Sequence, residues 1–284
     1  MATKDADGFE PLFNGVDLTG WFVTPRNYGD MWPGGPPVLE VYSDYFPADY
    51  NEHAAQNPAR WTVEDGAIVG RQEPPGSGWG GYVNTDKKYG DFELMFEANP
   101  DWPADTGIML RKIGNDFAGI QVLLDHRKSG AIGGFYGNGI SSFHAIPFSI
   151  DAVYDGNGKA VGLREDDPST SIEPFTQAKR DMLTHACTFE EFIAAWKFED
   201  WNEFRIRVVG AKPAITVWIN GLKVAAIDMA TLKAPNYDAD RVAAHLGREG
   251  HIAFEVHDTD KVLGPGRWGR DAACRWRNVR IKEL

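Results

Sequence analysis

Polar side chains interrupt two apolar stretches near the middle of the chain, GIMLRK and IQVLLDH. Side chains alternate between the two faces of a β-strand, so the aliphatic residues of both stretches share one face, which we expect to be buried. Arg111, Gln121 and Asp125 then lie on the opposite face, and a turn centred near Asp116 would place Arg111 roughly opposite Gln121. Such a face suits either a concave polar site or a solvated surface with an Arg–Asp pair.

A third stretch, GHIAFEVHDTD, repeats this pattern closer to the C-terminus. Ile252, Phe254 and Val256 form one apolar face, and Glu255 and His257 project from the other. A carboxylate two residues before an imidazole can fix its tautomer and raise its basicity, which suits general acid–base catalysis. The same side chains could instead bind a metal ion, or be exposed residues without a catalytic role.

Other residues could contact a substrate. His126 follows Asp125 directly, and His144 lies in an inserted stretch that could cover a site. Most of the ten tryptophans should be core residues, but aromatic faces also stack on sugars. We assign substrate binding to Gln121, His126, His144, Trp218 and Tyr136. The stretch DAVYDGNGKAVGLRED lacks the spacing of an EF-hand, so a turn explains it better than a cation loop.

Composition excludes several classes of function. Asp and Glu (41) outnumber Lys and Arg (29), the net charge is -12, and no basic cluster is present, which argues against nucleic-acid binding. Neither a phosphate-binding glycine loop nor a G-x-S-x-G nucleophile motif occurs. No apolar run approaches the roughly 18 residues of a membrane span, so we expect a soluble protein without a membrane partner. The sequence gives no indication of its oligomeric state.

The beginning of the chain, MATKDADGFEP, has no apolar signal region. The localisation is therefore open: periplasmic or extracellular if a signal has been removed, and cytoplasmic otherwise. Cys187 and Cys274 lie far apart in the sequence. They could form one bridge, but we favour two buried thiols.

Period-two patterns with turn residues between them predict an all-β fold. Asp65-Gly66 in WTVEDGAIVGR and Asn220-Gly221 in TVWINGLKVAAI are strong hairpin signals, because a tight turn needs the positive φ that Gly tolerates. DFELMFEAN alternates apolar and polar residues, as a strand with one wet face should. We therefore predict a sandwich or jelly roll of antiparallel strands.

Two stretches, 25–60 and 138–200, break this rhythm. The first is rich in Pro, Gly, Trp and Tyr, which predicts a long, ordered loop. In the second, Thr188 and Glu191 form a capping-box pattern that predicts a short amphipathic helix. We interpret residues 1–284 as one domain that carries these two elaborations.

A series of motifs along the chain resembles the 3-keto-disaccharide hydrolase family. In order they are GFEPLFNGVDLTGW, WTVEDGAIVG, GYVNTDKKYGDFEL, TGIMLR, GGFYG, WNEFRIRVVG, ITVWINGLKV and RWRNVRIKEL. The resemblance implies a concanavalin-like jelly roll of two curved antiparallel sheets. It also implies activity on glycosides whose glucosyl C3 hydroxyl has been oxidised to a ketone.

The chain departs from the family pattern at several positions. An Asn-Ser-Gly usually precedes the strand of TGIMLR, where this chain has Asp105-Thr106-Gly107. The following strand usually carries a Glu and a Gln before an Asp, and only Gln121 and Asp125 are present here. Near the end, Glu255 replaces a Gln, whereas His257 is retained. Both elaborations exceed the family pattern, which suggests a substrate larger than, or shaped differently from, a simple disaccharide.

The implied substrate defines the chemistry needed. A C3 ketone acidifies the C2 proton, so a base can remove H2, charge develops on O3, and the C1 substituent leaves. We assign His257 as the base, Glu255 as the residue that orients it, Arg111 as the O3 stabiliser and Asp125 as the acid. A divalent cation is left open; its ligands would be His257, Glu255 and Asp125. The competing hypotheses are a two-carboxylate glycosidase and a non-catalytic carbohydrate-binding module.

Overall fold

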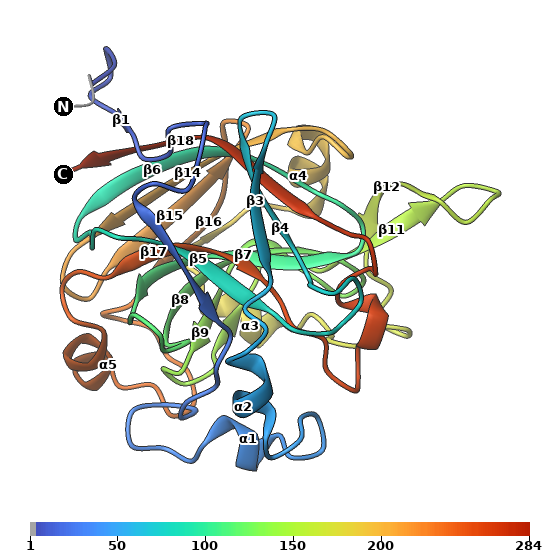
Figure 1. The fold of residues 1–284 in the computed structure, drawn as a ribbon, viewed down its shortest axis with the longest axis horizontal. Helices are drawn as coiled ribbons and strands as arrows, with labels where there is room; N and C mark the ends of the chain where they lie inside the picture. The colour runs from blue at the N-terminus through green and yellow to red at the C-terminus, as the bar shows by residue number, and fades with distance from the viewer. Residues whose placement is uncertain (1–3) are drawn as a thin grey trace.

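The computed structural model describes residues 4–284, in which antiparallel strands form two sheets that pack face to face (Figure 1). The larger sheet has nine strands. Its path runs β13 (His185–Ala186), β16 (Leu222–Asp228), β15 (Ala214–Ile219), β14 (Asn202–Val209), β6 (Phe92–Pro100), β18 (Cys274–Glu283), β4 (Ala67–Arg71) and β3 (Arg60–Glu64), with β1 (Glu10–Pro11) beside β18.

The seven-stranded sheet carries the residues of most interest. Its order is β10 (His144–Ala145), β9 (Ile132–Asn138), β8 (Gly119–His126), β7 (Ala104–Lys112), β17 (His251–Val256), β5 (Gly81–Thr85) and β2 (Trp21–Pro25). A separate hairpin of β11 (Ile150–Tyr154) and β12 (Ala160–Glu165) projects from the body of the molecule (Figure 1). This architecture confirms the predicted all-β jelly-roll sandwich.

Turn chemistry sets the register of the predicted hairpins. Asp65 and Gly66 have φ values of 49° and 76° and join β3 to β4. Asn220 and Gly221, at 49° and 84°, join β15 to β16. In both turns the two linking residues adopt the positive φ that lets the flanking strands keep their right-handed twist. Both predicted hairpins are therefore confirmed.

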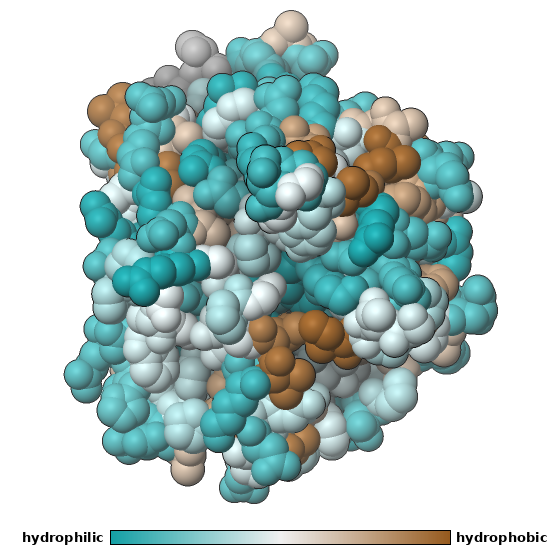
Figure 2. All heavy atoms as spheres, turned by 90° about the vertical axis from the view of Figure 1, so that its right-hand side faces the viewer, coloured by the Kyte–Doolittle hydropathy of each residue, from teal (hydrophilic) through white to brown (hydrophobic). Residues whose placement is uncertain are grey.

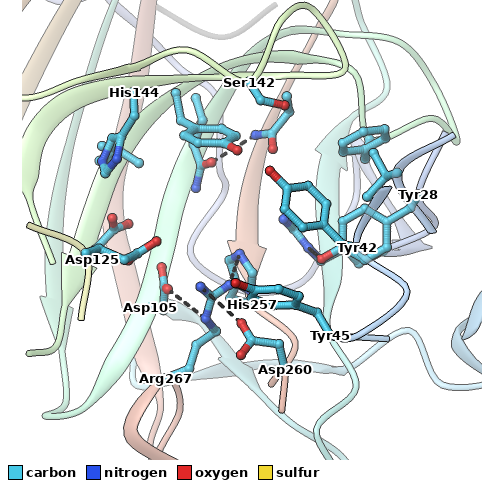
Figure 3. Close-up of a pocket in the computed structure, with 18 of the residues that line it drawn as sticks. Tyr28, Tyr42, Tyr45, Asp105, Asp125, Ser142, His144, His257, Asp260 and Arg267 are labelled. Atoms are coloured by element: carbon cyan, nitrogen blue, oxygen red, sulfur yellow. Dashed lines mark hydrogen bonds and ion pairs between the residues drawn. The ribbon is translucent and has the colours of Figure 1, made fainter. Parts of the chain in front are cut away.

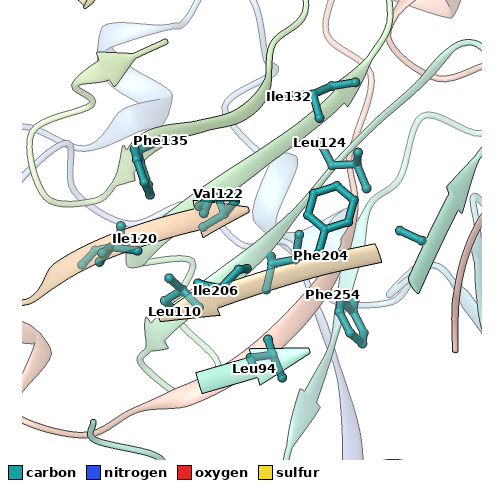
Figure 4. Packing of buried hydrophobic residues seen from close by; sticks show 14 of the residues in the cluster. Leu94, Leu110, Ile120, Val122, Leu124, Ile132, Phe135, Phe204, Ile206 and Phe254 are labelled. Atoms are coloured by element: carbon teal, nitrogen blue, oxygen red, sulfur yellow. The ribbon is translucent and has the colours of Figure 1, made fainter. Parts of the chain in front are cut away.

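The core lies between the two sheets (Figure 4). The seven-stranded sheet contributes the aliphatic faces read from the sequence, including Ile108, Val122 and Phe254. The nine-stranded sheet contributes Phe96 and Phe204, whose rings stack with centroids 5.0 Å apart. Burying each such side chain contributes about 1.5–3 kcal/mol. This apolar layer fixes which side chains of the seven-stranded sheet must face away from the core.

Short helices lie at the edges of the sandwich: α1 (Val38–Val41), α2 (Tyr50–Ala54), α3 (Gln177–Asp181), α4 (Phe189–Ala195), α5 (Ala239–Leu246) and a 3-10 turn at Gly264–Gly266. Helix α4 begins with the predicted capping box, in which Thr188 and Glu191 bond each other's backbone N–H groups. Stretch 25–60 contains α1 and α2, and 138–200 contains the β11–β12 hairpin as well as α3 and α4, so both are more regular than predicted.

Two further sequence predictions can be compared with the structure. Cys187 and Cys274 are both buried free thiols, which agrees with the favoured alternative. Over residues 4–284, no helix combines the length and the apolar character that crossing a membrane requires.

Candidate active site

A pocket of about 310 Å³ lies on the outer face of the seven-stranded sheet, between the sheet and stretch 25–60. This is close to the lower limit of typical ligand pockets, roughly 300–1,000 Å³. Figure 2 shows a hollow in a largely hydrophilic face, bordered by a hydrophobic patch. The lining includes charged and polar residues of the sheet and its loops: Asp105, Gln121, Asp125, Arg127, Tyr136, Asn138, Ser142, His144, Glu173, His257, Asp260 and Arg267. Stretch 25–60 contributes Arg26, Tyr28, Met31, Val38, Tyr42, Tyr45 and Phe46.

Three chemically active side chains form a row across neighbouring strands. Asp105 on β7 pairs directly with Asp125 on β8. Strand β17 pairs Phe254 with Ile108 of β7, and the same register continued by three residues brings His257 beside Asp105. Figure 3 shows the three side chains at the same end of the pocket. We call Asp125, Asp105 and His257 the catalytic row, after the role that we propose for them.

The two carboxyl groups of the row have opposite protonation preferences. Burial, followed by the charge of Asp105, raises the pKa of Asp125 well above its usual value of 3.8. Burial also acts to raise the pKa of Asp105, but the charges of Arg127 and Arg267 outweigh it and hold this pKa far below the usual range. Two opposed buried carboxyls cannot both be ionised without a large electrostatic cost. The environment of the pair therefore favours a protonated Asp125 beside an ionised Asp105.

Two arginines hold Asp105 in place. The Arg127 Nε donates to Asp105 Oδ2 over 2.6 Å, and its other end pairs with Glu173. Arg267 Nε lies 3.4 Å from the same oxygen, and its Nη2 lies 3.3 Å from Asp260. Sequence reasoning gave no role to Asp105, Arg127 or Arg267. The only signal for them was position, since Asp105 precedes Gly107 where the family has Asn, and Arg127 follows Asp125 by two residues.

His257 is oriented by Asp258, not by Glu255 as predicted. Its Nδ1 lies 2.7 Å from the Asp258 carboxylate and 2.9 Å from the Asp258 carbonyl oxygen, so this nitrogen is the donor. The lone pair then belongs to Nε2, which lies 3.1 Å from Arg267 Nη1. Burial, together with the charges of Arg26 and Arg267, lowers the pKa of His257 below 6.5. The imidazole is thus neutral and basic at one nitrogen.

Glu255 lies beneath the pocket in a separate network of buried charges. It is fully buried, it forms an ion pair with Arg26, and its Oε2 accepts from Gln121 over 2.6 Å. The Arg26 Nε lies 3.0 Å from Asp258, which also accepts from the hydroxyl groups of Tyr28 and Tyr50. Arg26 therefore compensates two buried carboxylates at once, and we call it the Arg26 node. The residue beside Glu255 on β7 is Gly107, and the side chain of Gln121 fills the space above this glycine. Glu255 therefore bonds Gln121 and not His257.

Gln121 shows how a glycine shapes the site. A Cβ added at Gly107 would lie 2.4 Å from Gln121 Nε2, so only glycine lets this amide cross β7 toward Glu255. The Gln121 Oε1 accepts from Asn138 over 2.9 Å. Both ends of the amide are therefore engaged. Gln121 lines the pocket as predicted, but its hydrogen bonds serve the buried network.

The predicted position of Arg111 is wrong. Its φ of 54° breaks the strand alternation, at the point where the β7–β17 register shifts. The guanidinium points away from the pocket and donates to the carbonyl oxygens of Gly90, Gly210 and Gly247. Met109, and not Arg111, is the residue opposite Gln121. Lys112 lies on the outer face instead, over the ring of Tyr82, and burial lowers its pKa to about 7.

Two predicted substrate-binding residues also lie elsewhere. His126 is on the core side of β8, where it bonds the Asp101 carbonyl and packs against aromatic rings. Trp218 is on the nine-stranded sheet, with Arg205 over its ring. His144 and Tyr136 do line the pocket, and their rings meet edge to face at 5.7 Å. Burial lowers the pKa of His144 to about 4, so it too is neutral.

The proposed metal ligands do not come together. His257 contacts Asp258 and Arg267, Glu255 contacts Arg26 and Gln121, and Asp125 pairs with Asp105. Within residues 4–284 no group of three or more His, Cys, Asp or Glu side chains has the arrangement of a metal site. Arginines fill the spaces between the carboxylates, and their charge opposes a cation. The donor set of the pocket therefore does not fit a divalent metal.

The chain belongs to a known family: residues 8–282 match the model of the 3-keto-alpha-glucoside-1,2-lyase-like domain. This is the family that the motifs indicated, and it makes the chain a carbohydrate-active protein. No curated protein matches the chain.

Solved structures with similar folds are distant. One, from Parabacteroides distasonis ATCC 8503 and named provisionally as a glycosyl hydrolase, is 16% identical, covers 98% of this chain and 95% of its own, and has a TM-score of 0.46. A beta-1,3-glucanase from Mycobacterium marinum is 13% identical, with 96% and 97% coverage and a TM-score of 0.45. A carbohydrate binding module from Bacillus subtilis is 9% identical, with 79% and 92% coverage and a TM-score of 0.40.

Removing the cation of the Arg26 node should be costly. We expect Arg26→Met to lower the free energy of unfolding by about 3–5 kcal/mol, because Glu255 and Asp258 lose the buried charge that compensates them. Adding Glu255→Gln should recover part of the loss. Denaturant unfolding of the single and double variants measures both effects. Arg60→Met removes an exposed arginine 3.5 Å from Glu73 and should cost no more than about 1 kcal/mol; an equal loss in both arginine variants would contradict the interpretation.

Gly107→Ala should break the amide bridge between Gln121 and Glu255. The added methyl group must displace Gln121, which leaves a buried carboxylate oxygen without its donor, so we expect about 1–3 kcal/mol of destabilisation. Gly162→Ala on β12 is the matched control, since nothing lies within 4 Å of the Cβ it would add. Denaturant unfolding compares the two. Equal stability of the two variants would show that Gln121 does not need the space at Gly107.

Proposed function

We propose that this protein cleaves the glycosidic bond of 3-keto-glucosides, beginning with removal of the C2 proton. The observation that carries the proposal is the catalytic row, where a neutral imidazole and a protonated carboxyl flank an anchored carboxylate in one pocket. The reaction needs one base and one acid on the same substrate, each in the protonation state that transfers its proton in the right direction. Family membership supports a keto-glucoside as the substrate.

His257 is the base in this mechanism. Its Nδ1–H is held by Asp258, so Nε2 accepts H2 as the C2–H bond breaks. The electron pair of that bond moves into an enolate whose negative charge lies on O3. In the free protein Arg267 Nη1 lies against the imidazole, 3.1 Å from Nε2 and 3.2 Å from Nδ1. When the keto oxygen of the substrate accepts this donor, the lone pair of His257 becomes free for H2.

Arg267 takes the role that the sequence gave to Arg111. Its guanidinium is anchored by Asp105 and Asp260 and lies beside the base, where charge on O3 would develop. A fixed cation in a water-poor pocket stabilises an oxyanion without reorganising during the reaction. Asp105 is a positioning residue, because it holds Arg267 on one side and keeps Asp125 protonated on the other.

Asp125 is the acid. The enolate collapses to a C1–C2 double bond as the bond from C1 to the glycosidic oxygen breaks, and Asp125 protonates the departing oxygen. The resulting Asp125 carboxylate is adjacent to Arg127, which limits the cost of its new charge. The proton taken up by His257 and the proton lost by Asp125 balance over the cycle. Water added across the C1–C2 double bond completes hydrolysis; release of the unsaturated ketone gives a lyase.

The Asp105–Asp125 pair also raises the alternative of a two-carboxylate glycosidase. That mechanism needs an ionised carboxylate free to attack C1 or to activate water. Asp105 is the ionised member, but its charge is neutralised by Arg127 and Arg267. Cleavage of an unoxidised glucoside at a rate similar to that of its 3-ketone would favour this alternative.

Replacing the base tests the proposal most directly. We expect His257→Asn to reduce turnover of a chromogenic 3-keto-glucoside by about 10²- to 10⁴-fold, as loss of a general base does. Exchange of the C2 hydrogen with solvent deuterium, followed by NMR, should fall in parallel, since exchange needs only the base. His245→Asn on the exposed side of α5 is the control and should keep full activity. Unchanged C2 exchange in His257→Asn would rule this residue out as the base.

The pH dependence follows from the two shifted groups. His257 must be neutral, so the rate rises as pH increases through its pKa, which lies below 6.5. Asp125 must be protonated, so the rate falls as pH increases through its pKa, which lies well above 3.8. We expect a bell-shaped profile of kcat/KM. Asp125→Asn should lower the maximum and remove the alkaline limb; an alkaline limb that persists unchanged would assign it to another group.

A further inference from the structure

The pocket has two chemically different ends along the strand direction. The catalytic row, His257–Asp105–Asp125, crosses the sheet at one end. Four residues away on each strand, the same register forms a second row of Ala253, Met109 and Gln121. Four residues of a strand span about 13 Å. Met109 and Ala253 are fully buried and do not line the pocket, so Gln121 alone of this second row faces it. The pocket therefore has a charged end and, about 13 Å away, an end whose character depends on the residues that cover Met109 and Ala253.

The apolar end is walled by stretch 25–60. Met31 and Val38 line the pocket, and Phe117 from the β7–β8 connection lies beside them. These three side chains pack as one buried cluster with Met109 and Ala253. Tyr42, half-buried, contacts the same cluster and also lines the pocket. Glu173 and Arg267 lie near the catalytic row, whereas Arg26 lies between the two ends, paired with Glu255 and bonded to Tyr82 of the apolar cluster.

Gln121, Asn138 and Ser142 line the pocket near this apolar wall, and each already contacts another side chain. The Gln121 amide donates to Glu255 and accepts from Asn138, so both of its ends are used. The Asn138 amide nitrogen also faces the sulfur of Met109 at 3.4 Å, and the Ser142 hydroxyl faces the sulfur of Met31 at 3.9 Å. A sugar placed there would leave several hydroxyl groups against sulfur and carbon atoms, without the water they had in solution.

We propose that the leaving group of the substrate is an aryl alcohol and not a second sugar. This inference rests on the proposed function, and it adds the class of the aglycone. The keto-sugar occupies the charged end, where Arg267 and His257 meet its O3 and C2. The aryl ring extends toward Met31, Val38 and Phe117, with the half-buried ring of Tyr42 beside it. An aromatic ring loses no hydrogen bonds in such an environment, and edge or offset contacts with Tyr42 and Phe117 add to its binding.

The test compares two ketones that share the glucosyl group. One is the 3-keto derivative of an aryl β-glucoside and the other a 3-keto-glucosyl-glucose, each prepared in both anomeric forms. We expect kcat/KM for the aryl ketone to exceed that for the disaccharide ketone of the same anomer by at least about tenfold, because unpaired hydroxyl groups in an apolar pocket are costly. Turnover of the disaccharide ketone at an equal or higher rate would overturn the aglycone assignment while leaving the proposed function intact. Cleavage of neither ketone would overturn both.

A pair of valine variants checks where the preference arises. Val38→Thr places a hydroxyl group in the apolar wall at nearly constant shape, and we expect it to reduce the ratio of aryl to disaccharide kcat/KM by about fivefold or more. Val23→Thr on β2 is the control, since Val23 is 39% exposed and lies outside the pocket. Thermal unfolding of both variants separates a folding defect from a change in selectivity. An unchanged ratio in a folded Val38→Thr protein would contradict the proposed position of the aryl ring.

Discussion

The site depends on one buried cation, Arg26. Glu255 and Asp258 are both fully buried, and burying an ionised carboxylate without a compensating charge is among the most costly events in folding. Arg26 pairs with both of them, and it comes from the end of β2, where stretch 25–60 begins. The ion pairs that compensate Glu255 and Asp258 therefore also fix stretch 25–60, which covers this sheet. Tyr28 and Tyr50 strengthen the link by donating to Asp258 from two points along that stretch.

This constraint extends to the catalytic chemistry through Asp258. Asp258 is the partner of Arg26 and also the acceptor that orients His257. Burial would raise the pKa of Asp258, but the hydrogen bond from His257 and the charges of Arg26 and Arg267 keep it well below its usual value. A carboxylate that stays ionised can hold Nδ1–H at any pH at which the fold is stable. The proposed base, His257, is thus oriented by a residue whose own charge is secured elsewhere, which leaves Nε2 of the imidazole free to receive a proton.

Much of the fold could be predicted from the sequence, because local rules dominate there. The alternation in GIMLRK, IQVLLDH and GHIAFEVHDTD assigns core-facing residues correctly, and the turn pairs at Asp65-Gly66 and Asn220-Gly221 set two hairpins. The prediction failed for Arg111 because one residue with positive φ reverses the alternation, and no feature of the sequence identifies that bulge. The same alternation places His126 on the core side of β8, opposite to Asp125. Assigning His126 to the site therefore conflicted with the rule that correctly assigned Asp125 to the outer face.

The partners of the site residues were less predictable for a different physical reason. Glu255 and His257 lie two residues apart on one face, which suggests a pair, yet each finds a stronger partner from another part of the chain. Arg26 is 229 positions before Glu255, and Arg267 reaches His257 from the loop that precedes β18. Ion pairs across such separations are set by sheet order and loop path, which strand periodicity does not encode. Strand periodicity encodes only which face of the strand a residue occupies. That information was sufficient to assign Asp125, Gln121 and His257 to the face on which the pocket lies.

The negative charge of Glu255 has a consequence for the pocket in this arrangement. A neutral amide at this position would need no cation, whereas the carboxylate requires Arg26 and accepts the amide of Gln121 as well. Gln121 lines the pocket, but its amide is held by Glu255 and Asn138, so it offers a substrate less hydrogen-bonding capacity than an unbound amide would. A charge introduced on this face of the sheet thereby occupies an amide that lines the pocket. The chemistry of the pocket at that end follows from electrostatic compensation below it, since the amide that would otherwise face the substrate is held by Glu255.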